Sequence, residues 1–512
     1  MLPIIPYPAF CRRLAGSFSL GEETRISADA SFLPAAELTV GRLRVPMCLP
    51  LVIEPASEPA NIRFVKDAGI EDPEAYTLRV DESGVEIRAS GEAGAFYGGQ
   101  TMLQLLPPAV FDSVPRHDAE WAIPFVEIED RPFFKWRGAM LDSARHFQPV
   151  SFIRKFIDVL AQHKVNVFHW HLVDDQGWRI EIKKYPLLTE VGSRRSDTLS
   201  GHWFHPRKHP DGQPHEGYYT QEEIRELVAY AAVRNIQILP EIEMPGHAQA
   251  AIAAYPHLGL LPEAAPVSTT WGVHKTLFNT KPATFEFLED VLDEVIALFP
   301  FPYLHIGGDE AVKDQWQASA ETQAHIRELG LADEHELQCW FIKKMSGFLQ
   351  SRGRKLVGWD EILEGGLGEG AVVMSWRNRD GAIEAAEKGM ETILCDQNFL
   401  YLDYYQQENT GDELLAIGGN TPLEKVHSYN PFPPEEGTPE KLAHALLGLQ
   451  AQVWTEYMPT TSRLEYMTFP RMCAFAEVAW SGAGRPDYAD FLDRLRPHLR
   501  RLDVQDIRYR SP

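Results

Sequence analysis

Two periodicities of apolar residues alternate along the chain from about residue 131 onward. Residues 152–160 repeat apolar side chains every three or four positions, which predicts an amphipathic helix, and Thr220-Gln-Glu-Glu223 reads as a capping box that begins another. Short apolar segments between helices are predicted as strands: Trp136–Leu141, Asn166–Val173, Gln237–Ile242, Tyr303–Ile306, Lys355–Gly358, Val372–Trp376, Thr392–Cys395 and Gly448–Trp454. Eight strands that alternate with helices predict a (β/α)8 TIM barrel, an α/β fold, over residues 131–512.

The first 130 residues have a different pattern, in which short strand-like pieces are separated by turns. Tyr76–Ala89 alternates apolar and polar residues on both sides of an Asp81-Glu-Ser-Gly84 turn, which is typical of a β-hairpin. Glu37–Val45 is predicted as a further β-rich piece and Ala93–Leu106 as a helix. We therefore expect residues 1–130 to form a small α+β domain that precedes the barrel.

An open, doubly wound sheet is the alternative for the larger part of the chain, because it also alternates strands with helices. Such a sheet would be expected to have a glycine-rich phosphate-binding turn after its first strand. Gly138, which follows Arg137, does not form such a turn, so the barrel is preferred.

Composition and charge argue against several classes of protein. The 512 residues are 44% hydrophobic and 24% charged, which is ordinary for a folded protein, and the apolar runs fall short of the ~18 residues of a membrane span. The net charge of −24 argues against nucleic acid and anionic membranes as partners, because both need a basic surface.

The cysteines and the first residues bear on the cellular compartment. Five scattered cysteines favour a reducing compartment over a disulfide scaffold. Prolines interrupt the first apolar stretch, and Arg12 and Arg13 follow it, which is the wrong order for a secretory signal. We therefore expect a cytoplasmic protein, and the sequence leaves its oligomeric state open, with a homo-oligomer as one option.

Polar and aromatic residues gather where the predicted barrel strands end, which is where barrel enzymes place their active sites. These residues are Asp142, Arg145, His146, Asp174, Asp175, Glu243, His247, Asp309, Glu310, Trp359, Asp360, Glu361, Trp376, Asp396, Tyr401, Asp403, Trp454 and Glu456. A single tryptophan is more simply explained as a core residue. Several tryptophans beside carboxylates instead indicate a sugar site, because the ring covers the apolar side of a sugar and the acids accept hydrogen bonds from its hydroxyls.

The most specific segment is His305-Ile-Gly-Gly-Asp-Glu310. Its glycines tolerate unusual φ angles, and adjacent carboxylates on a strand point in different directions, so Asp309 and Glu310 can have different roles. Adjacent acids and burial both raise a carboxyl pKa, and we expect this to keep one of the two protonated near neutral pH. The alternative interpretation is a helix N-terminus with acidic residues in its first turn.

His169-Trp-His171 supports a second class of function, a metal-dependent hydrolase of the amidohydrolase type. Residues i and i+2 of a strand share a face, so the two imidazoles are placed to bind one metal ion. The last predicted strand, however, is followed by Trp454-Thr-Glu456, where a lone aspartate would be expected. We prefer two histidines that pack inside the barrel and bond to Asp174 or Asp175.

Taken in order, the motifs resemble those of the β-N-acetylhexosaminidases of glycoside hydrolase family 20. The resemblance covers nearly the whole chain and is carried by Gly94–Leu106, Arg137–Phe147, Asn166–Trp178, Pro240–His247, His305–Glu310, Val357–Trp359, Tyr401–Asp403 and Trp454–Glu456. It implies a non-catalytic domain before a catalytic barrel. It also implies a carbohydrate substrate, terminal β-linked GlcNAc or GalNAc, with no metal and no cofactor.

The resemblance further implies a retaining mechanism in which the 2-acetamido group of the substrate is the nucleophile and an oxazolinium is the intermediate. Glu310 would be the general acid and base, Asp309 would hold the acetamido N–H, and Tyr401 would donate to its oxygen. The acetyl pocket would be formed by Trp359, Trp376 and Trp454. The sugar hydroxyls would be bound by Arg145, Asp403 and Glu456. Asp174 and His247 would form a supporting network.

One residue departs from the family pattern, and two questions stay open. The family usually has aspartate where this chain has Glu243, and the extra methylene would shift a contact near His247. The choice between GlcNAc and GalNAc, and the role of the loop 194–216, are not decided by the sequence. A sugar-binding protein without catalysis is a third hypothesis, which the presence of both Asp309 and Glu310 argues against.

Overall fold

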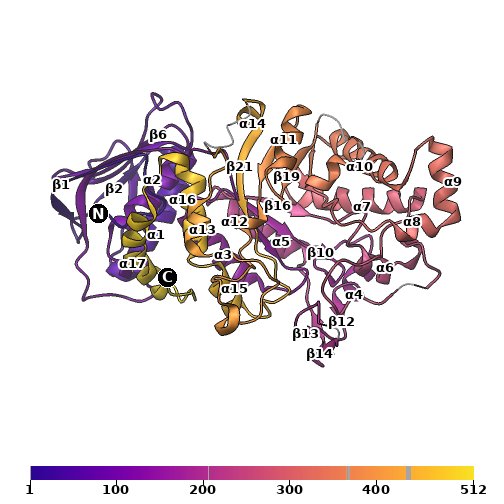
Figure 1. The fold of residues 1–512 in the computed structure, drawn as a ribbon. Helices are drawn as coiled ribbons and strands as arrows, with labels where there is room; N and C mark the ends of the chain where they lie inside the picture. Colours follow the sequence, from indigo (N-terminus) through magenta and orange to yellow (C-terminus); the bar gives the residue numbers. More distant parts are fainter. Residues whose placement is uncertain (1, 206, 264, 365, 367–369, 434–439) are drawn as a thin grey trace.

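The computed structural model describes the chain except residues 1, 206, 264, 365, 367–369 and 434–439. Figure 1 shows two bodies packed side by side, with the N-terminal domain in indigo and purple and the barrel beside it. The C-terminal helices α16 (Arg471–Ser481) and α17 (Tyr488–Val504) lie where the two bodies meet.

The N-terminal domain is a seven-stranded mixed sheet with two long helices. The sheet order is β1-β7-β5-β6-β4-β2-β3. The elements are β1 (Phe10–Ser19), β2 (Ile26–Ala28), α1 (Leu33–Met47), β3 (Ile53–Pro55), β4 (Ile62–Lys66), β5 (Tyr76–Asp81), β6 (Gly84–Ala89), α2 (Glu92–Leu105) and β7 (Ala122–Asp130). The predicted hairpin is confirmed, because β5 and β6 pair antiparallel with Asp81 opposite Gly84. The predicted helix over Ala93–Leu106 is α2, displaced by one residue at each end.

The prediction of a β-rich piece over Glu37–Val45 is wrong, because these residues lie inside helix α1. The segment carries apolar residues at alternating positions, but the side chains that α1 buries follow helical spacing and include Ala36, Val40, Leu43 and Met47. Helix α2 approaches closely, since a Cβ added at its Gly99 would lie 2.1 Å from the hydroxyl oxygen of Thr39. These residues contain both an alternating and a helical pattern of apolar side chains, and packing against α2 selects the helix.

All eight predicted strands form one closed parallel barrel, in the order β16-β17-β18-β19-β20-β21-β8-β9. Their bounds are β8 (Trp136–Asp142), β9 (Val167–His171), β16 (Gln237–Glu241), β17 (Tyr303–His305), β18 (Lys355–Trp359), β19 (Val372–Ser375), β20 (Glu391–Leu394) and β21 (Leu446–Ala451). The open-sheet alternative is therefore wrong. Among the outer helices are α3 (Val150–Gln162), α5 (Gln221–Ala232), α7 (Pro282–Leu298), α10 (Glu334–Ser351) and α11 (Asp380–Glu387), and α5 begins with the predicted capping box at Thr220.

A buried ion pair joins the N-terminal domain to the barrel. Lys164, which follows α3, lies 2.7 Å from Asp130 at the end of β7, and both side chains are fully buried. Asp130 also accepts hydrogen bonds from Tyr76 and from Trp480 of α16. This side of the barrel faces away from the ends of the strands that carry the candidate site residues.

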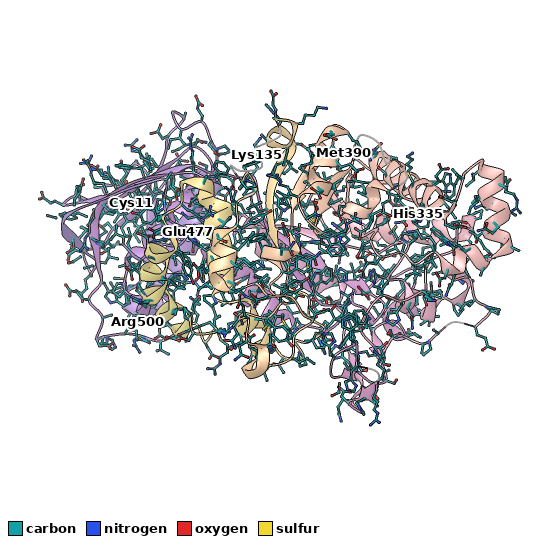
Figure 2. All side chains as sticks on the ribbon, in the orientation of Figure 1. Cys11, Lys135, His335, Met390, Glu477 and Arg500 are labelled. Atoms are coloured by element: carbon teal, nitrogen blue, oxygen red, sulfur yellow. The ribbon has the colours of Figure 1, made fainter. Side chains whose placement is uncertain are left out.

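The two ends of the chain are bound to each other. Arg494 of α17 donates to the carbonyl of Ile4 and, at 2.7 Å, to Glu477 of α16, which is labelled in Figure 2. Arg501 donates to the carbonyl of Pro3. All five cysteines are free thiols, and none of the described helices is long and apolar enough to cross a membrane.

Candidate active site

A pocket of about 180 Å³ lies at the carboxyl ends of the barrel strands. Parallel strands in a closed barrel all end on the same side, so residues far apart in the sequence meet there. Every residue to which the family resemblance assigns a role lines this pocket, namely Arg145, Asp174, His247, Asp309, Glu310, Trp359, Trp376, Tyr401, Asp403, Trp454 and Glu456. The other candidates at the strand ends, Asp142, His146, Asp175, Asp360, Glu361 and Asp396, are not part of its lining. Glu243, Tyr404 and Ile417 complete the lining.

The segment after β17 turns sharply to bring the acid pair into the pocket. Gly307, Gly308 and Glu310 all have positive φ angles, of 67°, 91° and 46°. A Cβ at Gly307 would lie 1.6 Å from Oε2 of Glu243, so any side chain there would have to displace that carboxyl group. The alternative of a helix N-terminus is wrong, since the next helix, α8, begins only at Asp314.

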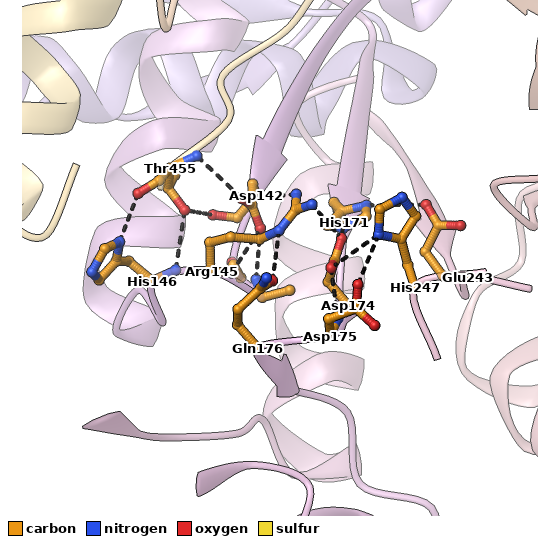
Figure 3. Close-up of polar contacts among 12 residues, drawn as sticks. Asp142, Arg145, His146, His171, Asp174, Asp175, Gln176, Glu243, His247 and Thr455 are labelled. Carbon is orange, nitrogen blue, oxygen red and sulfur yellow. Dashed lines mark hydrogen bonds and ion pairs between the residues drawn. The ribbon is translucent and has the colours of Figure 1, made fainter. Parts of the chain in front are cut away.

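Asp174 is the centre of a buried network of alternating charge (Figure 3). It lies 2.7 Å from Nη2 of Arg145, 3.0 Å from Nε2 of His171 and 3.3 Å from Nδ1 of His247. Burial alone would raise its pKa, but Arg145 and His247 hold the pKa well below the ordinary value. Asp174 is therefore a carboxylate that fixes three cationic side chains at the base of the pocket.

His247 connects this network to the acid pair. Its Nε2 lies 3.5 Å from Oε2 of Glu310 and 3.6 Å from Oδ2 of Asp309. Burial acts to lower the pKa of His247, but Asp174 and the other carboxylates around the ring raise it well above the ordinary value. The imidazole is therefore protonated at neutral pH and presents a positive charge to Glu310 and Asp309.

This charge opposes, for Glu310, the expectation that adjacency and burial keep one acid of the pair protonated. Burial raises the pKa of Glu310, but His247 and then Arg145 lower it by more, so the pKa of Glu310 lies below its ordinary value. The side chain is also 38% exposed. In the protein without substrate, the proton therefore resides on His247 and Glu310 is a carboxylate.

Aromatic rings form one wall of the pocket. Trp359 is buried and lies 5.9 Å from the ring of Trp454, while Trp376 is half-buried and stacks with Tyr401 at 6.3 Å. Arg145 lies over Trp454 at 5.1 Å. Burial raises the pKa of Tyr401 well above its ordinary value, so its hydroxyl stays protonated and can donate a hydrogen bond.

Two carboxyl groups lie on the side of the pocket near Arg145. Burial raises the pKa of Glu456 to about 7, against the opposing effect of Arg145. Burial and the neighbouring Glu456 raise the pKa of Asp403 well above its ordinary value. Oδ1 of Asp403 is buried without a hydrogen-bond partner among the described residues, which leaves it available for a polar ligand.

His169 and His171 lie inside the barrel and do not fit the metal site that the alternative hypothesis requires. Burial acts to lower the pKa of His171, but Glu241 and Asp174, which contact its two ring nitrogens, raise it to about 10. Both ring nitrogens of His171 are thus engaged by carboxylates, and among the described residues no group of ligand atoms close enough to hold one metal ion contains both histidines. His169 is bonded instead to Gln450 at 2.9 Å and lies 3.2 Å from Glu241.

The sequence analysis does not predict the contacts that Glu241 and Glu361 make in the barrel. Glu241 contacts His169, His171 and His305 at the centre of the barrel. A signal was present, because Glu241 directly follows the apolar residues Ile238–Pro240 in a strand of the barrel. Glu361 was noted at its strand end, but its contact with Trp376 depends on how two separate loops fold.

Family models match both parts of the chain. The model for the catalytic domain of glycosyl hydrolase family 20 matches residues 134–483, and the model for domain 2 of that family matches residues 1–131. The chain is 45% identical to a beta-hexosaminidase of Porphyromonas gingivalis over 99% of its own length and 64% of the relative's length. It is 36% identical to a beta-hexosaminidase of Vibrio furnissii, covering 93% of this chain and 76% of that protein.

Solved structures agree with these matches. An N-acetyl-beta-hexosaminidase of Streptomyces plicatus has a TM-score of 0.87 and 32% identity, covering 100% of this chain and 97% of that one. An exo beta-N-acetylglucosaminidase of Vibrio harveyi, in complex with N-acetylglucosamine, has a TM-score of 0.87 and 33% identity, covering 100% and 78% of the two chains.

Proposed function

The chain belongs to glycosyl hydrolase family 20, and from this membership and its pocket we propose that it is a retaining exo-β-N-acetylhexosaminidase. The substrate class is a terminal, non-reducing, β-linked GlcNAc or GalNAc residue. One observation carries the proposal: the pocket brings an adjacent acid pair, Asp309 and Glu310, together with a wall of three tryptophans and a tyrosine.

The reaction begins with attack by the carbonyl oxygen of the substrate's own acetamido group on the anomeric carbon. The glycosidic C–O bond breaks as Glu310 gives its proton to the leaving oxygen, and an oxazolinium ion forms. Glu310, now a carboxylate, then removes a proton from water, which opens the ring with retention of configuration. No side chain of the protein acts as nucleophile.

Asp309 and the aromatic wall make the acetamido group an effective nucleophile. Asp309 accepts a hydrogen bond from the acetamido N–H and stabilises the positive charge that develops there. Tyr401 donates to the acetamido oxygen. Trp359, Trp376 and Trp454 enclose the methyl group, so that attack occurs within a fixed geometry at high effective concentration.

The protonation of Glu310 depends on the substrate. In the free protein the charge of His247 keeps Glu310 ionised. A sugar that fills the pocket excludes water from Glu310, and burial raises a carboxyl pKa, so binding favours the protonated acid. The proton on His247, 3.5 Å away, is the nearest source in the described site.

The proposal is tested by comparing an aryl β-N-acetylglucosaminide with the matching aryl β-glucoside, both in EDTA. We expect fast release from the acetamido sugar and a rate lower by several orders of magnitude from the glucoside. Equal rates on both substrates would contradict substrate-assisted catalysis. Loss of activity in EDTA that returns with added metal would favour the metal-dependent alternative.

A further inference from the structure

Glu361 lies behind the aromatic wall of the pocket and has no part in the reaction described above. It belongs to the short 3-10 helix η4 (Asp360–Leu363) that follows β18, next to Trp359. Its Oε2 accepts a hydrogen bond of 2.9 Å from the indole N–H of Trp376, which follows β19. The carboxyl group thus joins two neighbouring strand ends through one side of the pocket wall.

A polar contact constrains the orientation of Trp376, whereas Trp359 is held by packing. Trp359 is 1% exposed and packs against His305 at 4.7 Å and Trp454 at 5.9 Å, and its own indole nitrogen has no partner among the described residues. Trp376 is half-buried, and its ring stacks on Tyr401 at 6.3 Å. The ring also packs against the buried cluster that includes Trp359 and Met374, and the hydrogen bond adds a directional contact that favours one rotation of the indole.

The surroundings of Glu361 suit a neutral acceptor. Burial, Asp309 and Asp360 together raise its pKa to about 9, so it is a carboxylic acid at neutral pH. Asp360 in turn is held by Arg377 at 3.1 Å. A neutral Glu361 accepts the indole N–H and avoids repulsion with the neighbouring carboxyl group of Asp309.

We propose that Glu361 is a positioning residue that holds Trp376 against the acyl group of the substrate and thereby sets selectivity for N-acetyl over longer N-acyl chains. The inference rests on the proposed function, because it concerns the acetamido pocket. Glu361 acts through Trp376 and does not touch the sugar. Its role is to limit the depth of the pocket on the side of β19.

The test compares Glu361→Leu, which removes the acceptor, with Glu361→Gln, which keeps a neutral oxygen at the same place. Glu364→Gln is the matched control, since Glu364 lies on the same loop and pairs with Arg377 at 3.2 Å. Each variant is assayed with aryl β-glucosaminides that carry N-acetyl, N-propionyl or N-butyryl groups. The quantity compared is the ratio of kcat/KM for N-acetyl to that for N-butyryl.

We expect Glu361→Leu to lower this ratio by about tenfold, in line with the loss of one hydrogen bond. Glu361→Gln and Glu364→Gln should stay within about twofold of wild type, which is within the range of surface substitutions. An unchanged ratio in Glu361→Leu would overturn the inference. So would a ratio in Glu361→Gln as low as that in Glu361→Leu.

A second variant covers the case in which Glu361→Leu does not fold. Glu361→Ala alone should also lower the selectivity ratio, but in a Trp376→Phe background, which lacks the indole N–H that Glu361 binds, Glu361→Ala should change the ratio by less than about twofold. An equal fall in both backgrounds would overturn the inference. Failure of the proposed function has a separate signature, because wild type itself would then hydrolyse the plain glucoside as fast as the N-acetyl sugar.

Discussion

Carboxyl groups of the same pocket carry different charges because their nearest neighbours differ. Asp174 is held as a carboxylate by Arg145 and by the histidines around it, whereas the pKa of Glu456 is raised to about 7 by burial. The pKa of Glu310 is lowered, because the effect of His247 outweighs that of burial. The neighbours of each side chain therefore decide whether that acid is charged. The backbone conformation, including the positive φ of His247 and Glu310, orients the side chains toward those neighbours.

At this scale we predict that Glu310→Gln loses most of its turnover and still binds the sugar. The amide cannot donate or accept the catalytic proton, and general acid–base catalysis contributes about 10²–10⁴-fold to a rate. Steady-state kinetics should show the fall in kcat, and titration with N-acetylglucosamine should show affinity close to that of wild type. Turnover at the wild-type rate would contradict the assignment of Glu310.

We also predict that Trp454→Ala impairs acetamido substrates more than plain glycosides. Trp454 contacts Trp359 and lies under Arg145, so its removal opens the wall that aligns the acetyl group. Misalignment of the internal nucleophile costs on the order of 10²-fold in rate. The measurement is kcat/KM on the two substrate classes, and an equal loss on both would argue against an acetyl pocket.

The strands of the barrel carry a second, internal layer of charge beneath the pocket. Glu241 of β16 contacts His171 of β9, and His171 contacts Asp174 beyond it. Burial would lower the pKa of His171, yet these carboxylates raise it to about 10. The contact between Glu241 and His171 therefore depends on how β16 lies against β9, and it also affects the charge of His171 beside Asp174 at the base of the active site.

We predict from this a dependence of stability on pH. A histidine whose pKa rises from 6.5 to about 10 on folding contributes stability that is complete below pH 6.5 and is lost as the pH rises through 10. Glu241→Gln removes the main source of the rise, so the decline, which begins near pH 6.5 in both proteins, should end at a lower pH and be smaller in total. Urea unfolding of both proteins between pH 6 and 10 gives the comparison.

The control for this prediction is Glu222→Gln, because Glu222 is 64% exposed and pairs only with surface cations in the described structure. Its unfolding curve should keep the pH dependence of wild type. The same dependence in Glu241→Gln and wild type would show that Glu241 does not keep His171 protonated.

The whole molecule is organised so that the N-terminal domain supports the barrel and leaves the pocket to the barrel alone. Every residue that lines the pocket lies between Arg145 and Glu456. The N-terminal domain is joined instead to α16, α17 and the buried Lys164, on the opposite side of the barrel. Its contribution to function is therefore expected to be through stability.

We predict that Lys164→Met destabilises the whole protein by about 3–5 kcal/mol, because it leaves Asp130 buried without its cation. The Lys183→Met variant is the control. Lys183 is 54% exposed and pairs with Glu222 on the surface, so its loss should cost less than about 1 kcal/mol. Chemical unfolding measures both. A loss in Lys164→Met no larger than in the control would show that the domain junction does not depend on this pair.

The sequence by itself determined the order of the elements and the identity of the residues at the strand ends. Apolar periodicity is a local property, and in a closed parallel barrel any residue that directly follows a strand must reach the same rim. This is why the sequence predicts that Arg145, Asp309 and Trp454 lie together at one rim of the barrel.

Only the tertiary structure decided how those residues are charged and held. The pKa of Glu310 depends on His247, and the orientation of Trp376 depends on Glu361, and both are contacts across neighbouring strands. Helix α1 was misassigned for the same reason, since its packing against Gly99 of α2 overrode an alternating pattern. Electrostatic and packing energies vary with distance in space, which the spacing of residues along the chain does not specify.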